Sequence, residues 1–250
     1  MRAQHNLSAM VDKFDRRWRL SESDREALLA IPYRIVDMAR GRFIAREGEP
    51  NHHCGVLLSG FAFSHKSTGD GARQILSIQM RGDLIDPVDC SSSAAAFSVQ
   101  ALTRVRVALL ARAALMEVAL DRPAVATALW MDTGANASIL AEWLLNVGRR
   151  DARSRLSHLV CEMAVRQETL ADGPVCSAEL PMTQEQLGDA TGLTSVHVNR
   201  TLQSLRRDGL IRTEAGRIHV MDWERLCEAG DFTPDYLQFA EAAEPLYAVH

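Results

Sequence analysis

Residues 194–211, TSVHVNRTLQSLRRDGLI, combine an apolar stripe with side chains that form strong hydrogen bonds. With the period of an α-helix, Val198, Leu202 and Leu205 fall on one face, and Gly209 ends the helix. The opposite face carries Ser, Asn, Arg and Gln side chains. A guanidinium pairs with the edge of a guanine, and an Asn or Gln amide pairs with the edge of an adenine. The chemistry that this face predicts is therefore recognition of base pairs in a major groove.

The segments on either side are predicted to position this helix. Thr183 caps a preceding helix, and Gln186 completes a capping box. A turn containing Gly192 leads to Thr194, the cap of the second helix, and residues 210–220 follow as two short strands around a glycine. This order predicts a helix-turn-helix with a wing. The expected DNA-binding residues are Thr183, Gln184, Thr194, Ser195, Val196, His197, Asn199, Arg200, Gln203 and Arg207.

Charge is distributed unevenly along the chain. The 250 residues carry a formal net charge of -4, which by itself argues against unspecific binding to polyanions. Between residues 195 and 220, however, five Arg stand against only Asp208 and Glu214. A local basic patch of this kind is the electrostatic footprint that double-stranded DNA requires.

The first half of the chain has a different pattern of apolar residues and turn signals. Residues 8–31 are predicted to form short helices, with Ser21 as a cap and Pro32 as a stop. Residues 35–110 contain short apolar runs separated by turn signals such as EGEPN and STGDG. Short strands with frequent turns indicate a β-sandwich or β-roll.

A long helix is predicted between these two regions. From Pro123, apolar or small residues recur with alternating spacings of three and four, which is typical of a two-helix seam. We expect the chain to form a homodimer through residues 123–148, with Trp143 in the seam. The predicted seam positions are 126, 129, 133, 136, 140, 143 and 147.

The motifs GEPNHHCGVLLSGFAF, DGARQILSIQMRGDLID and MTQEQLGDATGLTSVHVNRTLQSLRRDGLI resemble the Crp/Fnr family of bacterial transcription regulators. The resemblance covers most of the chain. It implies an α+β fold with an N-terminal β-roll of the cyclic-nucleotide-binding type, a long dimerisation helix and a C-terminal winged helix-turn-helix. The implied division is a sensor domain at 1–122, a dimerisation helix at 123–150, a DNA-binding domain at 151–232 and a tail at 233–250. The implied partners are a second copy of the chain, a palindromic DNA operator, RNA polymerase and an effector that the sequence does not identify.

Two departures from the family pattern bear on specificity and sensing. Where the family commonly carries a Glu four residues before the Arg of the recognition helix, this chain has Val196, while the Arg is kept as Arg200. Members that bind cAMP hold its phosphate with an Arg that follows a Gly-Glu-Leu motif. This chain supplies no Arg between Arg81 and Arg104, so a cAMP site is not expected. The candidate effector-pocket residues are Gly82, Asp83, Leu84, Ser92 and Leu140.

Other chemistries have weaker support. The five cysteines include no Cys-x-x-Cys pair and none before Cys54, which argues against a zinc ribbon or an iron–sulfur cluster, and packed reduced thiols are expected. His52 and His53 are adjacent, so they would point to opposite faces of a strand and could not share one metal. No His-x-His, glycine-rich phosphate loop or grouped catalytic triad occurs, so we expect no enzyme activity, no metal and no cofactor.

Two alternatives remain open at this point. One is a small-molecule or haem sensor in which the β-roll is the working part, and the other is a metal-dependent β-roll enzyme. No signal peptide and no apolar run of membrane-spanning length is found, so a cytoplasmic protein without membrane contact is expected.

Overall fold

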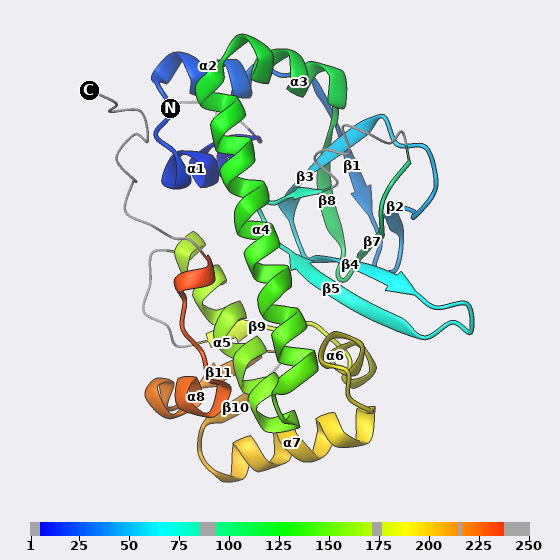
Figure 1. Cartoon of the computed structure of the whole chain (residues 1–250), viewed down its shortest axis with the longest axis vertical. Coiled ribbons are helices and arrows are strands. Elements are labelled where there is room, and N and C mark those ends of the chain that lie inside the picture. The colour runs from blue at the N-terminus through cyan, green and yellow to red at the C-terminus, as the bar shows by residue number, and fades with distance from the viewer. Residues whose placement is uncertain (1–5, 86–93, 172–176, 215–216, 238–250) are drawn as a thin grey trace. The chain divides into compact units, whose positions relative to one another are not determined.

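The computed structural model describes residues 6–85, 94–171, 177–214 and 217–237. The chain forms two compact units (Figure 1). Among the described residues, the first unit comprises those up to Lys66 together with Ser77–Ala137, and the second comprises Ser67–Leu76 and Ser138–Leu237. Within the described part of the chain, no helix has both the length and the apolar character needed to cross a bilayer.

The first unit is built around the predicted β-roll. One four-stranded sheet has the order β1 (Tyr33–Met38), β8 (Val105–Ala111), β3 (His53–Ser59) and β6 (Leu84–Ile85). The other has the order β2 (Phe43–Ala45), β7 (Ser98–Ala101), β4 (Ala62–Ser67) and β5 (Arg73–Gln79). β8 pairs antiparallel with β1 and with β3, and the inward side chains of both sheets form an apolar core.

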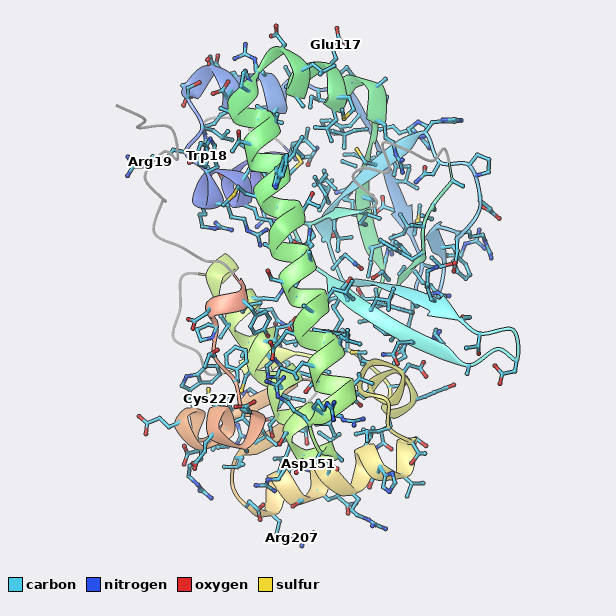
Figure 2. The ribbon with its side chains drawn as sticks, viewed as in Figure 1. Trp18, Arg19, Glu117, Asp151, Arg207 and Cys227 are labelled. Atoms are coloured by element: carbon cyan, nitrogen blue, oxygen red, sulfur yellow. The ribbon has the colours of Figure 1, made fainter. Side chains whose placement is uncertain are left out.

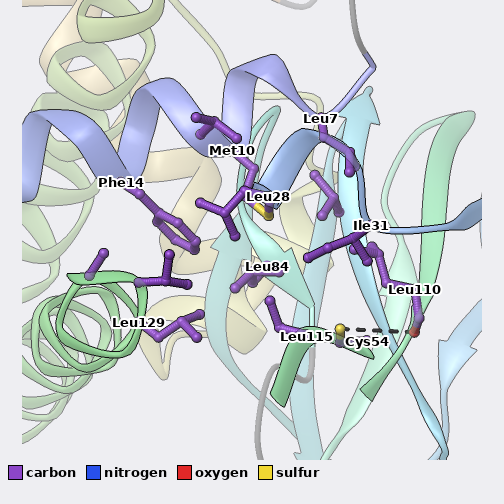
Figure 3. Close-up of a cluster of buried hydrophobic side chains, with 14 of the residues drawn as sticks. Leu7, Met10, Phe14, Leu28, Ile31, Cys54, Leu84, Leu110, Leu115 and Leu129 are labelled. Atoms are coloured by element: carbon purple, nitrogen blue, oxygen red, sulfur yellow. Dashed lines mark hydrogen bonds between the residues drawn. The ribbon is translucent and has the colours of Figure 1, made fainter. Parts of the chain in front are cut away.

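A second apolar core lies on the other face of the β1-β8-β3-β6 sheet. Helices α1 (Ser8–Arg17), α2 (Glu22–Leu29) and α3 (Arg112–Asp121) and the first part of α4 (Pro123–Arg149) cover this face. Figure 3 shows Phe14 pointing from α1 into the apolar cluster that also contains Leu129 of α4 and Leu84 of the sheet. The buried Cys54 thiol donates to the carbonyl of Leu110 across the sheet at 4.0 Å. The predicted packing of cysteines as small apolar groups is confirmed for Cys54 and Cys161, which are buried, while Cys227 is half-buried and Cys90 and Cys176 lie outside the described residues.

The local signals at the N-terminus act as predicted. Ser21 caps α2, and its capping box is completed by Asp24, whose pKa is lowered by the hydrogen bond from Ser21. Such a cap stabilises a helix by about 1 kcal/mol. Helix α3 was not predicted. It begins at Arg112, and its N-cap residue Ala111 makes no side-chain cap, so it carries no local start signal.

The second unit contains the predicted winged helix-turn-helix together with further helices and a third strand. It contains α5 (Ala152–Ala171), α6 (Gln184–Thr191), α7 (Ser195–Arg207) and α8 (Trp223–Gly230), and a short 3-10 helix, η1, at Asp235–Leu237. The wing strands β10 (Ile211–Glu214) and β11 (Arg217–Val220) are joined by a third strand, β9 (Ser177–Glu179), in the order β10-β11-β9. The sequence analysis did not predict β9, which pairs with β11.

Of the predicted seam positions on α4, 126, 133, 136 and 140 are exposed, whereas 129 and 143 are buried within the chain. Trp143 is only 5% exposed, and its indole N–H donates to the carboxylate of Glu162 on α5 at 2.8 Å. Leu129, another predicted seam residue, is also buried within its own chain. The large apolar side chains that α4 exposes are Trp130, Leu140, Leu144 and Leu145.

Candidate nucleic-acid interface

The position of α7 is set by the three apolar side chains that the sequence assigned to its buried face. Val198 and Leu205 are fully buried and Leu202 is 7% exposed, where α7 packs on α5 and α6. Burial of one such side chain is worth about 1.5–3 kcal/mol. Thr201, which the sequence analysis did not assign, is buried beside them. The other face of α7 is therefore directed into solvent.

Helices α6 and α7 begin and end as the sequence predicts. Thr183 accepts from the backbone N–H of Gln186, whose side chain returns a hydrogen bond, and Thr194 caps α7. Gly192 ends α6 with a φ of 65°, in the left-handed region. After α7, the N–H of Leu210 donates to the carbonyl of Leu205, which closes the helix as predicted around Gly209.

The exposed face of α7 borders a depression of about 420 Å³. Six of the ten predicted DNA-binding residues line it, and they come from α6 and α7. They are Gln184, Ser195, Val196, Asn199, Arg200 and Gln203. The side chain of Gln203 donates to that of Asn199 at 2.8 Å, so the two amides are held next to each other. Val196 is 66% exposed, which places it on the surface and confirms the predicted phase of the helix.

A second depression, of about 490 Å³, joins α7 to the start of α5. Arg200 and Arg207 line it together with Arg153, which the sequence analysis missed. Figure 2 shows Arg207 on the outer side of α7 and Asp151 where α4 passes into α5. Asp151 accepts from the N–H of Ser154, and this hydrogen bond lowers the pKa of the carboxylate. The basic run RRDARSR, which spans the end of α4 and the first turn of α5, is the sequence signal that could have drawn attention to Arg153.

Three arginines link the structural elements that form this surface. Arg153 binds the Asp208 carboxylate at 2.6 Å and thereby lowers the pKa of that group. Arg206 donates to Thr213 of the wing at 2.8 Å, and Arg155 donates to the Thr191 carbonyl in the turn at 2.9 Å. The remaining predicted residues, Thr183, Thr194 and His197, are exposed but line neither depression. The arrangement offers amides, a guanidinium and one methyl-bearing side chain on a protruding helix, with cations beside it.

Comparison with known proteins gives the same assignment for both units. Residues 140–229 match the Crp-like helix-turn-helix domain, and residues 35–122 match the cyclic nucleotide-binding domain. The chain is 29% identical over 197 residues to the transcriptional activator protein FnrL of Cereibacter sphaeroides, with 76% of this chain and 78% of that protein aligned. It is 31% identical over 162 residues to the nitrogen fixation regulation protein FixK of Azorhizobium caulinodans, covering 65% of this chain and 64% of that one. The solved structure of FixK2 from Bradyrhizobium japonicum superimposes with a TM-score of 0.73 at 26% identity, over 80% of this chain and 98% of FixK2.

The chain belongs to the Crp/Fnr family of transcription regulators. It is therefore a DNA-binding regulator and not an enzyme. The helix-turn-helix of this Crp/Fnr chain consists of α6 and α7, which lie within the matched residues.

In this Crp/Fnr chain, the turn predicted to hold an effector is packed against the N-terminal helix. Gly82, Asp83 and Leu84 are buried, and a Cβ at Gly82 would lie 2.8 Å from the Ala9 carbonyl oxygen. Asp83 binds the Lys13 ammonium of α1 at 2.8 Å, and its other oxygen accepts from a backbone N–H at 2.9 Å. Both carboxylate oxygens of Asp83 are thus bound by groups of the chain itself.

The same lysine extends the cluster to α4. Lys13 also binds Asp132 at 2.8 Å, and Arg17 donates to Asp132 at 2.6 Å. Of the other predicted effector residues, Ser92 lies outside the described residues and Leu140 is 47% exposed on α4. Among the residues that the structure describes, no group of three His, Cys, Asp or Glu side chains is placed to hold a metal ion.

We predict that Gly188→Ala disrupts the helix-turn-helix. A Cβ at Gly188 would lie 2.4 Å from the carbonyl oxygen of Leu193, in the turn that sets the angle of α7. The free energy of unfolding should fall by about 3 kcal/mol, since overpacking against backbone cannot be relieved by a rotamer change. Denaturant unfolding measures this cost, and DNA affinity should fall with it.

Gly209→Ala is the matched control. Gly209 follows the C-terminal end of α7, and a Cβ there meets nothing within 4 Å, so only the φ of 74° opposes it. Its cost should be about 1 kcal/mol. Equal costs at the two positions would contradict the tight turn.

Proposed function

We propose that this regulator binds as a homodimer to an inverted-repeat DNA operator, with α7 of each protomer in a major groove. The observation that carries the proposal is the exposed face of α7, where Val196, Asn199, Arg200 and Gln203 line one depression. Side chains of these types contact base edges when a helix enters a major groove.

The individual residues divide into two roles. Arg200 is proposed to bind a guanine, and the adjacent amides of Asn199 and Gln203 to read an adenine. Arg153 and Arg207 border the second depression next to the N-terminus of α5, and we assign them to backbone phosphates. Phosphate contacts fix the position of the protein, whereas base contacts choose the sequence.

The dimer is proposed to form along α4. Trp130 is 79% exposed and Leu144 is 74% exposed, and a helix with such large apolar side chains in solvent has an unfilled packing face. The homodimers of a family whose operators are inverted repeats require such a contact, because a two-fold protein matches a two-fold site.

The roles of the domains are proposed within the boundaries that the sequence analysis gave. Residues 1–122 are proposed as the sensor, 123–150 as the dimerisation helix and 151–232 as the DNA-binding domain. The effector is proposed not to be cAMP, because Asp83 is bound by Lys13 and no Arg follows it as a phosphate ligand. RNA polymerase is the proposed second protein partner, in keeping with relatives that are named transcriptional activators.

Arg200→Ala should abolish discrimination between operator and random DNA while the fold stays intact. Arg200 is exposed, and one Arg–guanine pair contributes about 1–3 kcal/mol of base preference. Affinities for both DNAs are measured by titration. Arg225→Ala removes the same charge from the exposed surface of α8 and should leave the ratio unchanged. An equal loss on both DNAs in Arg200→Ala would make this residue a phosphate contact.

Val196→Glu should change the base preferred at one position of each half-site. A Val offers only apolar contact, for instance to a thymine methyl, whereas a carboxylate accepts from cytosine N4. Stability should change by less than about 0.5 kcal/mol, because the side chain is 66% exposed. Site selection from a random DNA pool with both proteins measures the change. Identical selected sites would show that residue 196 reads no base.

Leu144→Asp should convert the dimer to monomers, because it places a charge in the proposed α4 interface. Sedimentation measures the mass. Leu120→Asp is the control, since Leu120 is 82% exposed on α3 and lies off the proposed interface. A dimer that persists in Leu144→Asp would refute this interface.

Added cAMP should change neither the melting temperature nor the DNA affinity. A ligand at about 100 times its dissociation constant would stabilise the folded state by roughly 2.7 kcal/mol, which a melting curve detects readily. Operator DNA serves as the positive control. A cAMP-dependent rise in melting temperature would contradict the proposed exclusion of cAMP.

A further inference from the structure

We infer that residues 231–237 form a strap that fixes the angle between the C-terminal end of α4 and the DNA-binding helices. The match to the helix-turn-helix domain ends at residue 229, and the sequence assigns residues 233–250 to a tail. Phe232 and Leu237 of this segment are nevertheless buried within the second unit. The inference rests on the proposed dimer, because the strap acts on the helix through which the protomers would pair.

The centre of the strap contact is a buried carboxylate on α5. Glu162 is 0% exposed, and one of its oxygens accepts from the indole of Trp143 at 2.8 Å and from the hydroxyl of Tyr236 at 2.9 Å. Its other oxygen accepts from Arg166 at 3.1 Å. A buried carboxylate without such partners would be costly. One group on α5 therefore joins a residue of α4 to a residue of the strap.

Contacts between aromatic rings also join the strap to α5. His158 of α5 is 1% exposed, its ring stacks on Tyr236 with centroids 5.7 Å apart, and Phe232 meets it edge-on at 5.2 Å. Nε2 of His158 lies 3.0 Å from the Tyr236 hydroxyl, and burial lowers the pKa of the imidazole. The strap thus packs on the same helix that carries α7.

A second connection reaches the end of α4 directly. Arg150 donates to the Asp231 carboxylate and to its carbonyl, both at 3.0 Å, and binds Glu142 of α4 at 2.6 Å. Asp231 has a φ of 46°, a left-handed conformation that is unfavourable for a residue with a side chain. The strap therefore begins with a strained residue that Arg150 holds in place.

These contacts give the strap a positioning role. α7 packs on α5, and the strap and Glu162 hold the Trp143 end of α4 on α5. In a dimer that pairs along α4, the angle between α4 and α5 sets the distance between the two copies of α7. The strap would therefore determine which spacing between half-sites the dimer accepts.

The test compares a chain that ends at Gly230 with one that ends at Leu237, which keeps the strap. Both are titrated with the selected operator and with the same operator lengthened by one base pair between its half-sites. The full chain and the chain ending at Leu237 should prefer the original spacing. The chain ending at Gly230 should lose about tenfold in affinity for that spacing and little for the longer one. Tyr236→Phe keeps the ring, removes the hydrogen bond to Glu162, and should reduce the spacing preference in the same direction, with Asp235→Ala as its control.

The ratio of the two affinities separates positioning from loss of stability. A merely less stable protein loses affinity for both spacings by the same factor, and this result in Tyr236→Phe would overturn the inference. A strapless chain with the full spacing preference would also overturn it. A full-length chain that binds no inverted repeat would overturn the proposed function and the inference together.

Discussion

The burial of Val198, Leu202 and Leu205 is the constraint on which the DNA-binding unit depends. These three side chains pack α7 against α5 and α6, and their spacing leaves only one face of the helix free. Arg200 and its neighbours are exposed for this reason, so their placement needs no further contact. The caps at Thr183 and Thr194 set where α6 and α7 start, the turn at Gly192 ends α6, and the apolar stripe sets the rotation of α7.

α5 is the element to which the other parts of this unit attach. Its N-terminal end holds Asp208 and the α6–α7 turn through Arg153 and Arg155. Its middle carries His158 and the buried Glu162, which bind the strap and α4. A polar network inside an apolar unit specifies one arrangement, because each donor or acceptor left without a partner costs free energy. The exposed face of α7 and the C-terminal end of α4, the proposed dimerisation helix, are therefore positioned by one helix.

Local signals explain what the sequence could predict. The capping boxes, the glycine turn and the helical period of α7 lie within a few residues of each other, so the helix-turn-helix and its exposed face could be derived directly. The orientation of Trp143 could not, because it depends on Glu162 in another helix. β9 exists only through its pairing with β11, and α3 starts without a side-chain cap. The contacts of Tyr236 could not be predicted either, because its partners lie more than 70 residues earlier in the chain.

Site selection with the wild-type chain tests the central claim most directly, namely that two copies of α7 read one operator. The purified protein is incubated with a pool of random duplexes, and the bound fraction is sequenced over several rounds. The account predicts an inverted repeat whose half-site centres lie about one helical turn, or roughly 10 base pairs, apart. Enrichment of a single half-site, of direct repeats or of no sequence at all would contradict it.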